Sequence, residues 1–236
     1  PINGWMVEGP ALEKETASFV GYFPGSPIRH GMTVGELALL FNAEKEIRAD
    51  LSVVPIAGWR RDLWFDDTNM PWVNPSPNMR NLIQATLYPG IGAIEYSNLS
   101  VGRGTDTPFE QVGAPWIDGR RLAARLNARQ IPGVTFYPTW FTPSSSKYKG
   151  ERCGGVYIMI TDREALRPVR VGVEMAAAIH GLYGDKLQLD PNVKLFGTGK
   201  VLTAIKKGED PARIAASWAA DEGRWRLLRN KYLVYR

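Results

Sequence analysis

The sequence predicts an α/β fold: a single domain with a small mixed sheet, flanking helices and a long loop-rich central region. Two patterns lead to this prediction. Helices with clear capping signals are interspersed with short apolar strands, and the stretch between residues 58 and 118 repeatedly breaks any periodicity. The chain has 236 residues, of which 44% are hydrophobic and 22% are charged. That length allows one large domain, and the composition excludes disordered and fibrous proteins.

The N-terminal quarter is expected to contain two strands and one helix. Residues 18–22 form an apolar stretch between turns, which favours a strand. Thr33 and Glu36 have the spacing of a capping box, so a helix is expected from there to about Ala49. Residues 51–56 are apolar and bounded by Asp50 and Gly58, which predicts a short buried strand.

The central region, residues 58–118, leaves room only for short helices near 79–87 and 91–96. It is rich in Trp, Arg, Asn and Gly. Long loops inside a compact domain usually carry function, and the aromatic residues argue against disorder. This region is therefore the first place to look for a site.

The C-terminal half returns to regular patterns. Asp118 is expected to cap a helix that ends before Pro132, and strands are expected at 134–137 and 156–160. Apolar spacing predicts helices over 171–182 and 201–205. Asp210 and Pro211 are expected to open a last helix that continues through Leu228.

Several functional classes lose support. No apolar window is long enough to cross a bilayer, so no membrane span is expected. The net charge of +5 is a modest excess, which makes a nucleic-acid partner the weakest hypothesis. Walker, dinucleotide and Gly-x-Ser-x-Gly motifs are absent from the sequence. One cysteine, Cys153, and two histidines make a metal site improbable, and no cofactor is expected.

Two short segments contain candidate functional side chains. Arg29 and His30 precede the predicted helix N-terminus, where they can clamp an anion or a sugar hydroxyl; equally, His30 can make a hydrogen bond within its loop. Glu95 ends an apolar run and begins a polar loop. It is either a partly desolvated carboxyl group facing loop atoms or the partner of Arg103 in a salt bridge.

Four tryptophans of the loop-rich region, Trp59, Trp64, Trp72 and Trp116, lie among Arg and Asn residues. An aromatic face beside hydrogen-bond donors suits sugar recognition, and the same set can stack nucleobases. The alternative is that a region without long helices uses these rings as its core.

A series of loop sequences appears in the order found in one protein family. It comprises Asn3-Gly4, Val7-Glu8-Gly9-Pro10, residues 18–21, residues 27–37, residues 75–79, Tyr88-Pro89-Gly90, Glu95, Asn98, residues 100–109, residues 113–116, residues 148–155 and residues 232–235. On these motifs the chain resembles the exo-β-N-acetylmuramidase (NamZ) family of peptidoglycan hexosaminidases.

The resemblance implies that residues 1–236 are a C-terminal domain, which the family usually joins to an N-terminal Rossmann-like half that this chain lacks. The implied reaction is removal of a terminal N-acetylmuramic acid from the non-reducing end of a glycan or muropeptide, at a cleft between the halves. Peptidoglycan fragments and the Rossmann-like half are the implied partners, and the implied location is periplasmic or secreted. The alternative is a non-catalytic carbohydrate-binding module that recognises amino sugars.

The same resemblance suggests roles for individual residues. Glu95 is expected to contribute a catalytic carboxylate, since glycoside hydrolysis uses two carboxyl groups, or one carboxyl group and the substrate's acetamide. Arg29, His30 or Arg103 is expected to face the lactyl carboxylate of muramic acid. The remaining expected substrate-binding residues are Asn78, Asn98, Thr105 and Trp116.

Overall fold

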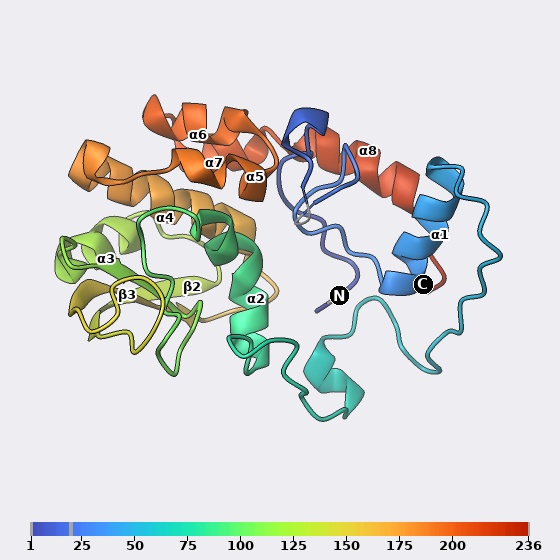
Figure 1. The fold of residues 1–236 in the computed structure, drawn as a ribbon, viewed down its shortest axis with the longest axis horizontal. Helices are drawn as coiled ribbons and strands as arrows, with labels where there is room; N and C mark the ends of the chain where they lie inside the picture. Colours follow the sequence, from blue (N-terminus) through green and yellow to red (C-terminus); the bar gives the residue numbers. More distant parts are fainter. Residues whose placement is uncertain (1, 19–20, 236) are drawn as a thin grey trace.

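The computed structural model describes residues 2–18 and 21–235. It has two parts, which are visible in Figure 1. One, called here the α/β lobe, contains the sheet and helices α2 to α7. The other contains the N-terminal segment, α1, the loop that follows it, and α8. The helices and strands are α1 (Val34–Glu44), α2 (Leu82–Ile91), β1 (Gln111–Ala114), α3 (Gly119–Asn127), β2 (Val134–Phe141), β3 (Cys153–Ile160), α4 (Pro168–Tyr183), α5 (Val193–Phe196), α6 (Gly199–Lys206), α7 (Pro211–Ala216) and α8 (Ala219–Arg229).

The sheet of the described residues has three strands in the order β1-β3-β2. Both pairings are antiparallel, with Val112 opposite Val156 and Tyr137 opposite Tyr157. The α/β class and the small sheet are thus confirmed, but the expectation of a mixed sheet is wrong. Strands β2 and β3 are the two predicted strands extended by a few residues, and an antiparallel pair of neighbours needs only a loop between them.

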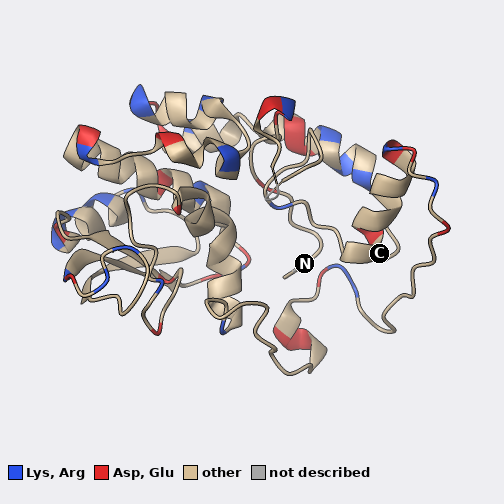
Figure 2. Cartoon of the chain, viewed as in Figure 1, with Lys and Arg blue, Asp and Glu red and all other residues tan. Residues whose placement is uncertain are grey.

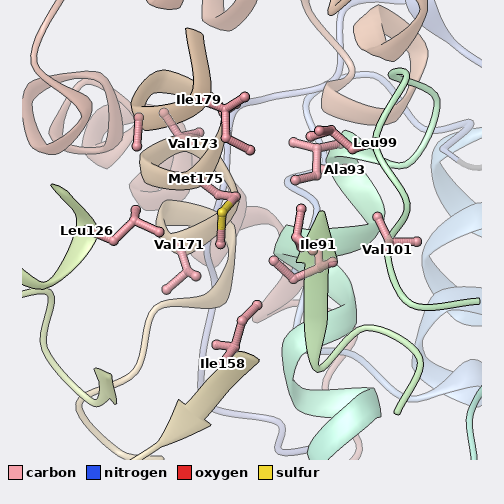
Figure 3. Close-up of a cluster of buried hydrophobic side chains, with 14 of the residues drawn as sticks. Ile91, Ala93, Leu99, Val101, Leu126, Ile158, Val171, Val173, Met175 and Ile179 are labelled. Carbon is pink, nitrogen blue, oxygen red and sulfur yellow. The ribbon is translucent and has the colours of Figure 1, made fainter. Parts of the chain in front are cut away.

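The core of the α/β lobe forms where α4 packs between the sheet and α2. Val171, Val173, Met175 and Ile179 of α4 are fully buried. Figure 3 shows Val171 and Met175 on the side of Ile158 and Ile91, and Ile179 on the side of Ala93 and Leu99. Helix α4 is apolar around most of its circumference, as expected for a helix that is covered on several sides.

Helices α2 and α4 meet at two glycines. A Cβ atom on Gly90 would lie 1.6 Å from the carbonyl oxygen of Pro168, and one on Gly172 would lie 2.3 Å from the carbonyl oxygen of Gly90. Since backbone atoms cannot yield as a side chain can, these glycines set the distance between the two helices.

Most helix predictions are confirmed at their N-termini. Thr33 and Glu36 form the expected capping box of α1, and the carboxylates of Asp118 and Asp210 accept backbone N–H groups at the starts of α3 and α7. The ends differ: α1 stops at Glu44 rather than near Ala49, and the last predicted helix is divided into α7 and α8. Helix α4 begins at Pro168, three residues earlier than expected.

Of the two strands predicted in the N-terminal quarter, the one at residues 51–56 is not found, and the one at residues 18–22 lies partly outside the described residues. Residues 51–56 belong to no helix or strand, and Val54 is 88% exposed, so this segment is not a buried strand. Of the stretch 18–22, Phe19 and Val20 lie outside the described residues. Ser18 and Gly21 exchange backbone hydrogen bonds of 2.8 and 3.2 Å. At residues 51–56, apolar composition alone did not identify a strand, because no partner strand among the described residues is paired with this segment.

We predict that Gly90→Ala lowers the free energy of unfolding by about 2 kcal/mol or more, because the added methyl group must separate α2 from α4. Urea denaturation followed by circular dichroism measures the change. Gly223→Ala in α8 is the matched control, since nothing lies within 4 Å of its Cβ position. That variant should gain up to about 1 kcal/mol from helix propensity. Equal stability of the two variants would contradict this account of the helix crossing.

Candidate functional site

Glu95 and Arg103 are brought together as a bidentate ion pair. The Nε atom of Arg103 donates to Oε1 of Glu95, and its Nη2 atom lies 3.2 Å from Oε2. Glu95 directly follows a 3-10 turn, Gly92–Ile94, and Arg103 lies between two glycines with positive φ, Gly102 and Gly104. The side chains of Glu95 and Arg103 are 18% and 32% exposed. The pair is thus held rigidly yet remains reachable from solvent.

Other charged and aromatic groups surround this pair. The Arg103 guanidinium lies over the ring of Phe109, 5.1 Å from its centroid, and Tyr88 contacts the same ring edge-on. Lys147 donates its ammonium hydrogens to the carbonyl groups of Glu95 and Ser97. Burial raises the pKa of Tyr88, with Glu95 contributing, and burial lowers the pKa of Lys147. One carboxylate therefore faces two cations beside aromatic rings.

Thr105 belongs to the same loop as Arg103, but its hydroxyl group stabilises the loop. It donates to the carbonyl oxygen of Gly102 at 2.7 Å and accepts from Nε2 of Gln111 at 2.8 Å. Asn98 is also held by its neighbours, because its side chain bonds the backbone of Lys186 and Gln188 at 2.7 and 2.9 Å.

Two further predicted residues lie in other surroundings. Trp116 packs edge-on against Tyr183, with a centroid distance of 5.4 Å, and joins the main core. Asn78 is half-buried, and its backbone N–H lies 3.3 Å from Oγ of Ser76. Within the described part of the chain, no hydrogen bond joins Asn78 or Trp116 to Glu95 or Arg103.

Arg29 lies at a different place, against the N-terminal segment. Its backbone forms an isolated antiparallel bridge with Glu8. Its guanidinium, only 9% exposed as a residue, lies 3.1 Å from Oδ1 of Asn3 and also contacts the sulfur of Met6. Burial lowers the pKa of Arg29 to about 10, so the side chain stays charged at neutral pH. Arg29 is thus a buried cation far along the chain from Arg103.

His30 is next to Arg29 but takes no part in a cationic clamp at neutral pH. Burial lowers the pKa of His30 to about 4, and its Nδ1 atom accepts the backbone N–H of Met32 at 3.2 Å. The side chain lines a largely apolar cavity of about 330 Å³ with residues such as Leu12 and Phe41. This hydrogen bond lies within its own loop, as one of the two interpretations of His30 had it.

Sequence reasoning missed Glu8, which is the most unusual carboxyl group of this region. Glu8 is 4% exposed, and its Oε1 atom accepts the backbone N–H of Arg170 in the first turn of α4 at 2.8 Å. Its Oε2 atom is buried without a hydrogen-bond partner. Burial raises the pKa of Glu8 to about 7, against weaker lowering effects from the backbone of Arg170 and the charge of Arg29. The available signal was a glutamate that directly follows the apolar run Trp5-Met6-Val7.

Glu8 also lines a cavity of about 360 Å³ between the N-terminal segment, α4 and α8. Trp5 and Arg167 lie on the same cavity, with the guanidinium of Arg167 5.4 Å from the Trp5 ring centroid. Trp5 is 37% exposed. The cavity therefore combines an accessible aromatic ring, a cation and a buried carboxyl group.

Two structural features bear on metal binding and membrane association: the grouping of metal-ligating side chains and the hydropathy of the helices. Within residues 2–18 and 21–235, no group of three or more His, Cys, Asp or Glu side chains is arranged to hold a metal ion. Over the same residues, no helix combines the length and the hydropathy needed to cross a bilayer. Figure 2 shows Lys and Arg positions spread over both parts and interspersed with Asp and Glu.

Solved structures define the class of this fold. Two crystal structures of DUF1343 family proteins from Bacteroides fragilis superpose with TM-scores of 0.90 and 0.78, at 28% and 30% sequence identity. They cover 100% and 99% of this chain, and the chain covers 64% of each of them. The chain thus shares the α/β architecture of that family.

Sequence comparison gives the particular family. Residues 86–235 match the family model described as "Exo-beta-N-acetylmuramidase NamZ, C-terminal", and residues 1–83 match the corresponding N-terminal model. The chain belongs to the NamZ family. It is 44% identical over 238 residues to the peptidoglycan beta-N-acetylmuramidase NamZ of Bacillus subtilis (strain 168).

The extent of the match limits the domain assignment. The whole chain aligns with the Bacillus subtilis protein but spans only 57% of that protein's length. Because the N-terminal family model already matches residues 1–83, a Rossmann-like half outside this chain stays a prediction. The assignment of residues 1–236 to a single C-terminal domain likewise stays a prediction.

We predict a distinct pH dependence of stability from Glu8. Its pKa is about 7 in the folded chain against an ordinary value of 4.5, so the folded state binds this proton more tightly. The free energy of unfolding is therefore largest below the ordinary value and falls as the pH rises toward the folded value, by roughly 3 kcal/mol from this group.

Urea denaturation at several pH values checks this prediction. Glu8→Gln should flatten the fall and exceed the wild type in stability above neutral pH, because an amide does not ionise. Glu15→Gln changes an exposed glutamate and should follow the wild-type curve. Parallel curves for wild type and Glu8→Gln would show that Glu8 is already ionised in the folded chain at acidic pH.

Proposed function

We propose that this chain is part of a peptidoglycan glycoside hydrolase that releases terminal N-acetylmuramic acid from the non-reducing ends of glycan strands or muropeptides. The observation that supports this most strongly is the 44% identity, along the entire chain, with a protein named as a peptidoglycan beta-N-acetylmuramidase. A carboxylate held within reach of solvent by a guanidinium, beside aromatic rings, suits this chemistry.

Glu95 is the proposed catalytic carboxylate of this chain. Hydrolysis of a glycosidic bond passes through a transition state in which positive charge develops on the sugar ring. An oriented carboxylate stabilises that charge electrostatically or forms a bond to the anomeric carbon. The bidentate contact with Arg103 fixes the orientation of Glu95, and Lys147 fixes the backbone on which it is mounted. Arg103 therefore acts as a positioning residue for Glu95. Thr105 acts as a positioning residue for the loop that carries Arg103.

The second catalytic group is proposed to come from the substrate's acetamide or from the Rossmann-like half. We infer that such a half, corresponding to the part of the Bacillus subtilis relative that this chain does not span, completes the cleft. Peptidoglycan lies outside the cytoplasmic membrane, so the proposed location is periplasmic or secreted. No cofactor is required, since the reaction consumes only water.

A chromogenic N-acetylmuramic acid glycoside tests the proposal. The chain is assayed alone and after addition of a chain that corresponds to the uncovered part of the Bacillus subtilis relative. Glu95→Gln should lower kcat by about a hundredfold or more while the protein stays folded, because the amide carries no charge to oppose the oxocarbenium ion.

Glu209→Gln, which changes an exposed glutamate, is the matched control and should retain wild-type kcat. Turnover that survives Glu95→Gln would remove Glu95 from the mechanism. Tight binding of muropeptides with no turnover in any combination would favour the carbohydrate-binding module instead.

A further inference from the structure

Five residues around Glu8 form a cluster that the catalytic proposal leaves unused. Asn3, Trp5 and Glu8 belong to the N-terminal segment, Arg29 forms a backbone bridge with Glu8, and Arg167 precedes α4. We call this set the Glu8 cluster. Asn3, Glu8 and Arg29 are buried, at 1%, 4% and 9% exposure, whereas Trp5 is exposed and Arg167 is half-buried. Trp5, Glu8 and Arg167 thus line the cavity of about 360 Å³, and Asn3 and Arg29 are buried next to Glu8.

The cluster carries two positive charges, on Arg29 and Arg167, and one carboxyl group, Glu8, whose charge acts on both. Arg170 and Arg226, which line the same cavity, form salt bridges with Glu174 and Glu222 at 3.3 and 3.5 Å. Among the described residues, no salt bridge is found for Arg29 or Arg167, whose nearest protein acceptors are neutral atoms of Asn3, Met6, Glu164 and Leu166. Buried charges in folded proteins are usually paired, so two guanidinium groups that share one carboxyl group leave an excess positive charge that suits an anion.

Hydrogen-bonding capacity is unmatched at the same place. Nδ2 of Asn3 and Oε2 of Glu8 are two of only three buried side-chain polar atoms in the described residues that lack a partner. Leaving such an atom unsatisfied destabilises the folded state, because the atom loses its hydrogen bonds to water and gains none in return. Arg29 connects the two residues, since it bonds Oδ1 of Asn3 and its charge acts on Glu8. A ligand that supplies both an acceptor and negative charge would satisfy all these groups together.

We propose that the Glu8 cluster is a saccharide subsite that binds the carboxylate of an acidic amino sugar, N-acetylmuramic acid, through Arg29 and Arg167, with Trp5 against the sugar ring. The inference rests on the proposed function for the identity of the sugar. It assigns recognition of the lactyl carboxylate to Arg167 and Arg29 rather than to Arg103, because the Nε and Nη2 edge of Arg103 is already occupied by Glu95.

A carboxylated sugar fits this cluster better than a neutral sugar or a bare anion. Planar guanidinium groups bind carboxylates in bidentate fashion. The indole ring of Trp5 offers an apolar face for the C–H groups of a pyranose, and a half-protonated carboxyl group next to it can both donate to and accept from sugar hydroxyl or amide groups. A free anion would make no use of the exposed Trp5 ring, and a neutral sugar would leave the excess positive charge of the cluster without a counter-charge.

Binding measurements on the full chain test the proposal. Isothermal titration calorimetry compares N-acetylmuramic acid with N-acetylglucosamine, which lacks the lactyl carboxylate. Arg167→Gln should weaken binding of N-acetylmuramic acid by about tenfold or more and leave binding of N-acetylglucosamine nearly unchanged. The matched control is Arg152→Gln, because Arg152 lies over Trp140 at 4.5 Å in the same type of stack at another surface. That variant should bind both sugars as the wild type does.

Three results would overturn the proposal: wild-type affinity in Arg167→Gln, an equal loss for both sugars, or an equal loss in Arg152→Gln. Should Arg167→Gln fail to fold, the wild-type chain still decides the question. The indole N–H resonance of Trp5, assigned with Trp5→Phe, should shift on titration with N-acetylmuramic acid. An unshifted Trp5 resonance at saturating sugar would refute the subsite.

The pH dependence of binding supplies a second readout. Charged groups from three segments surround Glu8. Arg29 lies on the segment that bridges to Glu8, and Arg167 and Arg170 lie at the start of α4. The ion pair of Glu222 and Arg226, on α8, lines the same cavity. Ionised Glu8 competes with the sugar carboxylate for Arg29 and Arg167, so affinity should fall as the pH rises through about 7. In Glu8→Gln that fall should disappear, and a persistent fall would contradict the assignment.

Failure of this inference can be told from failure of the proposed function. If Arg167→Gln still hydrolyses the chromogenic glycoside and keeps the wild-type selectivity for N-acetylmuramic acid over N-acetylglucosamine, the subsite is refuted. The hydrolase proposal is then unaffected. Binding of N-acetylmuramic acid that depends on Arg167, without turnover in any combination of chains, would retain the subsite and refute the hydrolase.

Discussion

The position of the N-terminal segment depends on one buried interaction, in which the carboxyl group of Glu8 accepts the backbone N–H of Arg170 at the start of α4. Helix α4 has no side-chain N-cap of its own, so Glu8 satisfies a group that would otherwise be orphaned. A carboxyl group enters this environment readily only when its proton is retained, which is why its pKa is raised to about 7. The segment that carries Asn3 and Trp5 is thereby fixed against the α/β lobe. On its other side, Arg229 bonds the carbonyl groups of Gly4, Trp5 and Gly31 and ties the segment to α8.

The arginines of this chain lie in two different electrostatic environments, one with a carboxylate bound to the guanidinium and one without such a salt bridge. Arg103 is neutralised by a bidentate carboxylate, and its role is to orient that carboxylate. Arg29 and Arg167 lie near Glu8, whose pKa burial raises to about 7, so this carboxyl group neutralises them less as the pH falls below that value. In the proposed hydrolase, Glu95 would supply the fixed negative group for the developing positive charge, and the Glu8 cluster would supply a separate positive site for a sugar carboxylate. This division of charge links the fold to the proposed reaction.

The sequence allowed prediction of local features more readily than of tertiary ones. Capping at Thr33, Asp118 and Asp210 follows from spacing within four residues, and it is confirmed. The salt bridge between Glu95 and Arg103, eight residues apart, was one of two stated alternatives. The apolar residues 51–56 were mistaken for a strand because apolar composition does not reveal whether a partner strand exists. The proximity of Glu8, Arg29 and Arg167 joins segments up to 160 residues apart, which no motif in a single sequence encodes.

The most direct measurement is a crystal structure of this chain with N-acetylmuramic acid bound. The account predicts the lactyl carboxylate within hydrogen-bonding distance of the Arg29 and Arg167 guanidinium groups, with the pyranose ring against Trp5. It also predicts an acceptor opposite Nδ2 of Asn3, an atom that is unsatisfied in the free chain. A sugar that binds only beside Glu95 and Arg103, or only in the apolar cavity lined by Leu12 and Phe41, would contradict the account.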